Sequence, residues 1–336
     1  MSSFAQMDVH FAIPFDHTLF IEEELLGAVR SIGLQGGRLE LPCDGGLGRR
    51  KALRPPVSAP DTLTRCLPNG SWGRRAEADP KISVQAALVV LSTICKLDFD
   101  LAGNQIGGES VNKAAGTVSS WFASFSHWLW VLTSQNLDPM NPDPKVLHRR
   151  SGNTVITASA DGKTSLPVSG PSVASISLTI DGPRAERLVN QAVLDVAVQN
   201  AGIAPSMTLE LLASARMAAR RGDNRRSLID AGTAVEAALS HALGLGNMHL
   251  FTLGSLITQA ENQGLTVPAD TRTSLVHPRN DAVHRGLLSA SINIDRALEV
   301  AELIASLADP YLVPIASLTP VNRPQWNEIV FIKGPS

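Results

Sequence analysis

The residues best suited to chemistry lie together in one stretch of ten, HPRNDAVHRG at positions 277–286. The stretch holds two histidines, two arginines, an asparagine and an aspartate, although only 18% of the chain is charged. Arginine forks bind phosphate oxygens and stabilise negative charge in a transition state, and an imidazole with an ordinary pKa of about 6.5 accepts or delivers a proton near neutral pH. Arg279, Asn280 and His284 are therefore candidate residues for chemistry on a phosphodiester.

A helix is needed to bring these three side chains together. Because proline suits the first helical position and disfavours helical backbone at the residue before it, we expect a helix to begin at about Pro278. Arg279 and Asn280 would then lie in its first turn, where unpaired backbone N–H groups and the positive end of the helix dipole favour a phosphate. Asn280 and His284 are four residues apart and share a helix face, and Arg279 is long enough to reach them.

The same residues have a structural interpretation of equal weight. Polar side chains at the start of a helix often cap it. Arg279 could also pair with an acidic residue such as Asp281 or Glu236, with little effect on stability if the pair is exposed. Residue types and spacing alone leave both interpretations open.

The sequence contains no pattern typical of a metal or cofactor site. His277 and His284 are seven residues apart, so they do not form the HxxxH pair that binds zinc on a helix. The three cysteines are widely spaced and form no CxxC pair, which argues against a thiolate zinc site or a disulfide framework: Cys43, Cys66 and Cys95. We therefore expect no metal and no cofactor, and a cytoplasmic location.

Length and composition indicate a globular protein with two domains. A chain of 336 residues with 44% hydrophobic residues can fill two ordinary cores. The formal charge of −2 gives no whole-molecule attraction to nucleic acid or anionic lipid, so such binding needs a local patch. The N-terminus lacks a signal-peptide pattern, and the longest apolar stretch, Val84–Cys95, is too short to cross a bilayer, so we expect no membrane attachment.

The first half of the chain, residues 1–183, predicts a strand-rich α+β domain. Residues 95–101 alternate apolar and polar side chains, as a half-buried strand does. Residues 155–168 place Asp161 and Gly162 between two strand-like runs, which is the signal of a tight hairpin. A further strand is expected at Ser175–Ile180.

One helix is expected in this half, at residues 111–135. Trp121, Phe125, Trp128 and Leu132 fall at helical spacing along it. Such aromatic side chains can stack on nucleobases, but at this spacing they more often pack a helix against a sheet, which is the interpretation we favour. The histidines of this half are isolated and predict no nucleophile and base arrangement: His10, His17 and His127.

Residues 36–75 are rich in Gly, Pro and Arg and show no period, which predicts a long loop or a partly disordered segment. The segment contains GGLGRRK, which lacks the terminal Lys-Ser or Lys-Thr of a phosphate-binding loop. Its basic cluster has no aromatic residues between the charges, and such clusters are most often solvated surface: Arg49, Arg50, Lys51 and Arg54.

The second half predicts an all-helical domain at residues 184–310, with its core at about 206–310 and a tail at 311–336. Apolar residues at helical spacing are separated by glycine and proline, which stop helices. The first expected helix could belong to either domain. The expected helices are Arg184–Asn200, Thr208–Arg221, Asn224–Leu243, Leu253–Asn262 and Ile292–Leu307.

This helical half resembles the HEPN superfamily, the "higher eukaryotes and prokaryotes nucleotide-binding" domain. The motif RNDAVH at residues 279–284 is similar to the RNxxxH motif of that family, with an apolar lead-in and a following Gly286. Residues 211–240 resemble the first helix pair of such domains, with a Gly-Asp turn and an Ala-rich second helix that carries one glutamate. The resemblance covers about residues 206–310 and does not extend to the first half of the chain.

The resemblance implies an all-α HEPN-like helical bundle, which would follow the α+β domain that the residues of the first half predict. It also implies a metal-independent endoribonuclease that acts as a homodimer and leaves 2′,3′-cyclic phosphate ends, as defence and toxin proteins of the family do. Carried over, Arg279 would bind the scissile phosphate, Asn280 would position it, and His284 would act as general base or acid. Glu236 is a candidate supporting residue, with a pairing role to Arg279 as its structural alternative.

Two other functions are consistent with the sequence. The helical half could be a non-catalytic HEPN module for dimerisation or nucleotide binding. Alternatively, the first half could carry an activity of its own and the helices could dimerise it. If the activity lies in the helical half, the first half could be its sensor, inhibitor or targeting domain, with a regulatory partner. Basic residues of the second half are candidates for RNA binding, or form a solvated edge: Arg220, Arg221, Arg225 and Arg226.

Overall fold

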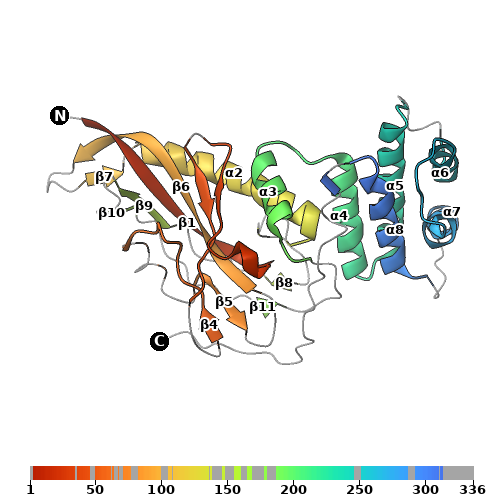
Figure 1. Ribbon diagram of the computed structural model, residues 1–336, viewed down its shortest axis with the longest axis horizontal. Helices are drawn as coiled ribbons and strands as arrows, with labels where there is room; N and C mark the ends of the chain where they lie inside the picture. Colours follow the sequence, from red (N-terminus) through yellow and green to blue (C-terminus); the bar gives the residue numbers. More distant parts are fainter. Residues whose placement is uncertain are drawn as a thin grey trace.

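The protein is elongated, with an antiparallel sheet at one end and a group of helices at the other (Figure 1). The strand-rich first half and the helical second half expected from the sequence are both confirmed. The computed structural model describes residues 3–34, 36–45, 50–61, 63, 67, 71–76, 82–99, 105–107, 109–135, 137, 146–147, 155–159, 165–168, 178–179, 187–245, 251–286, 292–309 and 311–312.

Two long strands, β1 (Ser3–Ile21) and β6 (Ile82–Phe99), form the spine of the sheet. They pair antiparallel along nearly their whole length, with an irregularity in register between Pro14 and Leu19. Residues 86–91 of β6 are all buried, because this part of the sheet is covered on both faces. The apolar stretch noted in the sequence is therefore a central strand.

Shorter strands extend the sheet on both sides of this spine in the order β10-β9-β1-β6-β3-β2, with β5 and β7 also on β6 and β4 on β5. A separate pair joins β11 to β8. The remaining strands are β2 (Val29–Ser31), β3 (Arg38–Glu40), β4 (Arg50–Ala52), β5 (Gly73–Ala76), β7 (Gln105–Gly107), β8 (Val146–Leu147), β9 (Val155–Ser159), β10 (Ser165–Val168) and β11 (Leu178–Thr179).

Most strand predictions are confirmed and one loop prediction is wrong. The hairpin is β9 and β10, which pair from Ser159 to Ser165, although Asp161 and Gly162 lie outside the described residues. The expectation of a long loop over residues 36–75 fails because β3, β4 and β5 lie within it. These strands are only three or four residues long, too short to show a period, and are stabilised by pairing with distant partners.

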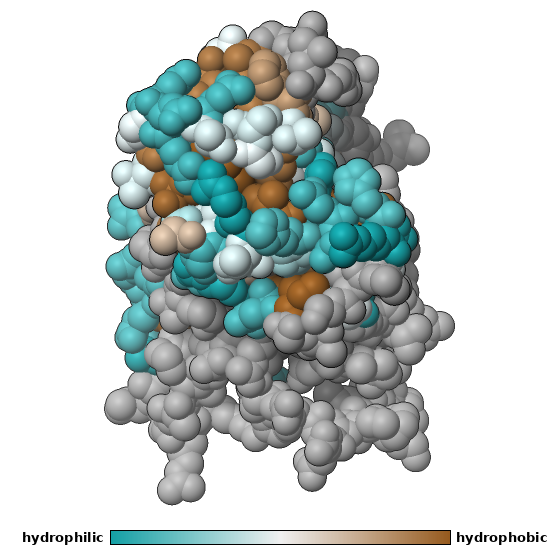
Figure 2. Space-filling model, turned by 90° about the vertical axis from the view of Figure 1, so that its right-hand side faces the viewer, coloured by the Kyte–Doolittle hydropathy of each residue, from teal (hydrophilic) through white to brown (hydrophobic). Residues whose placement is uncertain are grey.

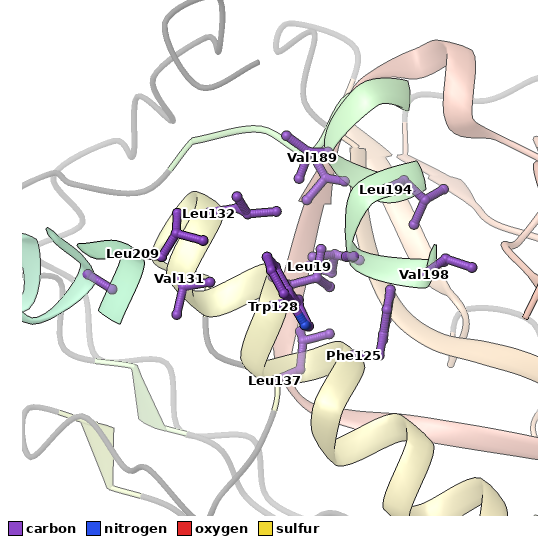
Figure 3. Close-up of a cluster of buried hydrophobic side chains, with 14 of the residues drawn as sticks. Leu19, Phe125, Trp128, Val131, Leu132, Leu137, Val189, Leu194, Val198 and Leu209 are labelled. Atoms are coloured by element: carbon purple, nitrogen blue, oxygen red, sulfur yellow. The ribbon is translucent and has the colours of Figure 1, made fainter. Parts of the chain in front are cut away.

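Helix α2 (Glu109–Thr133) runs from the sheet to the helical end of the molecule (Figure 1). The aromatic residues of the predicted stripe are buried: Trp121 is 4%, Phe125 1% and Trp128 2% exposed. Figure 3 shows Trp128 and Phe125 among side chains of β1 and α3, with Leu209 of α4 beside Val131. The core interpretation of the aromatic stripe is confirmed, so these rings do not present a surface for nucleobases.

The helices of the second half follow the expected order and, except for the first, the expected bounds within two residues. Helix α3 begins seven residues later than expected because Val189 pairs with the end of β1 and Asn190 caps the helix. It packs against α2 and β2. The helices are α3 (Gln191–Asn200), α4 (Met207–Arg220), α5 (Asn224–Ala242), α6 (Leu253–Asn262), α7 (His277–His284) and α8 (Ile294–Ser306), with short turns at Glu23–Leu25 and Arg272–Val276.

A buried ion-pair cluster joins α4 and α8 to the sheet half. The Glu302 carboxylate accepts hydrogen bonds from Arg216, at 2.7 Å, and from Arg187. Arg216 also donates to the Val131 carbonyl of α2, and its side chain is only 2% exposed. We call Arg187, Glu302 and Arg216 the buried triad.

None of the helices in the described part of the chain is long and apolar enough to span a membrane.

Candidate functional site

Helix α7, which carries the RNDAVH motif, begins at His277, one residue from the expected start, but this start is not the free helix end that was expected. A π-helical turn, Arg272–Val276, runs directly into α7, and His277 has helical backbone with φ −64° and ψ −49°. The N–H of His277 donates to the carbonyl of Arg272, five residues earlier. The wider π turn accommodates the ring of Pro278, which would otherwise clash with the carbonyl four residues before it.

This arrangement removes one argument for a phosphate site. Arg279 and Asn280 lie in the interior of a continuous helical segment, so their backbone N–H groups are not at a free helix end. The first turn of the segment lies at Thr271, where the carbonyl of Asp270 accepts the N–H of Ser274. Any phosphate binding at the motif must therefore come from side chains.

Arg279 is held against α5. Its Nη2 lies 2.9 and 3.0 Å from the two carboxylate oxygens of Glu236, and each side chain is 17% exposed. Of the two acidic partners considered from the sequence, Glu236 makes this pair, while Asp281 lies 3.2 Å from Arg285. The ion pair links the middle of α7 to the middle of α5.

A glycine makes room for this pair. A Cβ on Gly232, one turn before Glu236, would lie 2.7 Å from Cγ of Arg279 and 3.2 Å from its Nε. The arginine stem therefore lies directly on the backbone of α5, and its buried Nε has no hydrogen-bond partner among the residues that the structure describes. Any larger residue at position 232 would displace the guanidinium.

The Glu236 carboxylate is in an unfavourable position for a charge. Burial raises the pKa of Glu236 above its ordinary value of 4.5, even though Arg279 and the backbone N–H of Leu253 act in the opposite direction. The desolvation cost thus exceeds what one arginine and one N–H return. Perturbed carboxylates of this kind are common at functional sites.

The other two motif residues extend from Arg279 along α7. Nη1 of Arg279 lies 3.4 Å from Oδ1 of Asn280, which is half-buried. His284 ends the helix one turn later on the face of Asn280 and is exposed. Glu236, Arg279 and Asn280 therefore lie in a row, and the exposed His284 forms the end of this row that faces solvent.

The arginines predicted to bind RNA do not form one surface. Arg225 lies beside the motif, because its Nε donates to the Ala282 carbonyl at 2.9 Å. Arg226 is exposed on the same helix end and pairs with Asp230 at 3.3 Å. Arg220 instead points towards α2, where it approaches the Ser134 carbonyl at 3.5 Å, and Arg221 is exposed near Met217.

Two other described histidines, His10 and His127, lie in the first half of the chain, away from the motif. His10 lies in β1 and is 3% exposed, and burial lowers its pKa below 6.5. His127 lies at the surface of α2, 3.6 Å from Glu210. The side chain of His17 lies outside the described residues. His277 is exposed at the start of α7.

Sequence reasoning missed Gly232 and the role of Arg225. A signal for the glycine was present: an isolated glycine inside a helical pattern commonly marks close packing, and Gly232 is four residues before Glu236. No sequence signal identifies the contact of Arg225 with Ala282, which depends on how α5 and α7 cross.

The site lies at the helical end of the molecule. Figure 2 views this end, where hydrophilic residues form a band across the described surface with hydrophobic residues set among them. No family model, no curated protein and no solved structure matches the chain. The candidate function therefore depends on the residues and their geometry.

Proposed function

We propose that the protein is a metal-independent endoribonuclease of the HEPN type, and that α4 to α8 form its helical bundle. The antiparallel packing of α4 and α5 across the turn at Gly222 and Asp223 supports this, because it agrees with the helix pair of that family. The row of Arg279, Asn280 and His284 on α7 supports it further. A role in antiviral defence or as a toxin would fit such an enzyme.

The observation that carries the proposal is the way Arg279 is held. A half-buried guanidinium, tied to a carboxylate with a raised pKa over a glycine, is costly to build and adds little stability. Its other nitrogen reaches Asn280, one turn from an exposed histidine. Pre-organised charge beside a proton carrier is the arrangement that phosphodiester cleavage requires.

In the proposed reaction the ribose 2′-oxygen attacks the adjacent phosphorus and the bond to the 5′-oxygen breaks. His284 accepts the proton of the 2′-hydroxyl, or delivers one to the leaving 5′-oxygen. Arg279 stabilises the charge that develops on the phosphate oxygens, and Asn280 orients the phosphate. The products are a 2′,3′-cyclic phosphate and a 5′-hydroxyl.

Two copies of the chain are proposed to supply the complete site. The row of residues on α7 is open at His284, and a second copy would place another arginine and histidine opposite it. Arg225 and Arg226, at the adjoining end of α5, are proposed to contact the RNA backbone.

The experiment that tests this function is incubation of the purified full chain with mixed RNA in EDTA, followed by analysis of the product ends. We expect cleavage to 2′,3′-cyclic phosphates by the native protein and none by His284→Ala. His277→Ala is the matched control, because it removes an exposed histidine from the same helix outside the row. Equal loss in both variants, or cleavage by His284→Ala, would contradict the assignment.

A second candidate is a non-catalytic HEPN module. It is favoured by the ion pair itself, since Arg279 is already engaged by Glu236 before any substrate binds. A protein that dimerises, leaves all RNA intact and keeps its dimer in the His284→Ala variant would fit this function and not the nuclease.

A further inference from the structure

Two basic runs that are far apart in the sequence meet on the sheet. β4 pairs antiparallel with β5, with Lys51 opposite Arg75 and Ala52 opposite Arg74, and β5 in turn pairs with β6. The backbone of Arg54 is fixed by two hydrogen bonds with Cys43. The pairing gathers five basic residues into what we call the basic ribbon: Arg50, Lys51, Arg54, Arg74 and Arg75.

Two of these charges have no carboxylate partner among the described residues. Arg75 contacts the carboxylates of Glu23 and Asp44, at 2.7 and 3.7 Å. Arg54 and Arg74 are exposed, and within the part of the chain that the structure describes neither has a carboxylate at ion-pair distance. The result is a positive edge on a chain whose formal charge is −2.

We propose that the basic ribbon binds the phosphate backbone of RNA without regard to base sequence. Guanidinium groups form paired hydrogen bonds with phosphate oxygens, and alternate residues of a strand share one face, so side chains on one face recur about every 6.6 Å. The indole of Trp72, just before β5, is fully buried and donates to the Leu67 carbonyl, so it offers no face for a base. The binding is therefore electrostatic and falls with salt.

The ribbon fits a chain-like polyanion better than a membrane surface. Stable anchoring to a membrane combines basic residues with an apolar face or acyl chain that inserts beside them. Among the described residues between 50 and 76, Val57 is the one large apolar side chain that is exposed. A narrow two-stranded element with separate charges instead follows an extended phosphate backbone.

A purely structural role makes a different prediction. β4 is an edge strand, and charged residues on edge strands prevent pairing with other chains. If the charges served only this purpose, their removal would cause aggregation and leave RNA affinity unchanged. The two roles are thus separable by experiment.

The ribbon and α7 lie well apart along the long axis of the molecule (Figure 1). Only the choice of RNA over other nucleic acid rests on the proposed function. An RNA that engages both places in one chain must be long enough to span them, so the ribbon would favour cleavage of long RNA over short fragments.

Fluorescence anisotropy with a labelled single-stranded RNA of about 20 nucleotides tests the proposal. The substitution His284→Ala is introduced into the full chain for this measurement, so that the RNA stays intact. We expect Arg54→Gln with Arg74→Gln to weaken binding about tenfold and to reduce the slope of log affinity against log salt by about 1.4, since each lost contact contributes about 0.7. Arg54→Lys with Arg74→Lys should keep most of the salt dependence.

The matched control is Lys113→Gln with Arg272→Gln, which removes two positive charges from α2 and from the turn before α7. The proposal is overturned if the double glutamine variant binds RNA like the parent, if the control loses as much, or if the parent binds anionic phospholipid vesicles and no RNA. Sedimentation of each variant separates aggregation from loss of binding. Absence of cleavage by protein with intact His284 would count against the nuclease and leave this binding result unchanged.

Discussion

The buried triad and the Arg279–Glu236 pair are built from the same residue types, but the pKa of the glutamate is shifted in opposite directions in the two. Glu302 lies between two arginines at the junction of the two halves, and Arg216 is 2% exposed. Burial opposes the charge on Glu302, but Arg216 and Arg187 outweigh it, so its pKa lies below 4.5. Glu236 has one arginine and more solvent, yet its pKa lies above 4.5.

The difference shows that the number of arginine partners, and not burial alone, decides whether the pKa of a carboxylate is lowered or raised. Two arginines compensate the desolvation of Glu302, so the triad holds the halves together. One arginine does not compensate that of Glu236. A pair that adds little stability but fixes an arginine beside Asn280 and His284 is better explained by function.

The largest expected effect comes from neutralising each glutamate. Glu302→Gln should lower the free energy of unfolding by about 3 to 5 kcal/mol, because it leaves the buried charge of Arg216 and the half-buried charge of Arg187 without an anionic partner. Glu236→Gln should leave stability at pH 7 unchanged or slightly higher, because the fold already favours the neutral side chain. Urea denaturation measures both, with Glu299→Gln as the exposed control on α8. Equal losses of unfolding free energy in Glu302→Gln and Glu236→Gln would contradict the proposed difference between the two glutamates.

The next largest effect is expected from Gly232→Ala, which tests whether cleavage depends on the position of Arg279. The added Cβ would lie 2.7 Å from Cγ of Arg279, so the guanidinium must move, and a shift of about 1 Å can reduce cleavage by about 100-fold. Stability should change little, since alanine gains up to about 1 kcal/mol over glycine in a helix. Gly116→Ala in α2, where nothing lies within 4 Å, should keep full cleavage. Normal cleavage by Gly232→Ala would mean that the position of Arg279 is irrelevant.

The smallest expected effect is that the contributions of Glu302 and Glu236 to stability change with pH in opposite directions. The folded pKa of Glu302 is lowered, so its contribution to stability is present above pH 4.5 and is lost as the pH falls below that value. The folded pKa of Glu236 is raised, so its carboxylate lowers stability as the pH rises through that pKa. The free energy of unfolding of the native protein is measured from pH 4 to 7, and that of Glu236→Gln is subtracted from it at each pH. This difference should decrease by less than about 1 kcal/mol as the pH rises. An increase over this range would contradict the raised pKa.

Much of the fold could be predicted locally. The bounds of α6, the hairpin of β9 and β10, and the burial of Trp128 follow from period and turn residues. The candidate row on α7 was also found from residue types and spacing. The expectation of a free helix end at Pro278 was wrong, because α7 continues from a π turn in which Leu275 and Val276 are buried.

The sequence by itself determined which segments become helices or strands and which residues can do chemistry, because period, turn residues and side-chain types are local properties. Only the tertiary structure decided which charges meet. Glu302 and Arg216 are 86 residues apart, Glu236 and Arg279 are 43 apart, and Lys51 meets Arg75 through strand pairing. An arginine in a buried triad, one in an ion pair and one on an open edge look alike in the sequence, since the cost of each charge depends on neighbours that only the folded chain brings near.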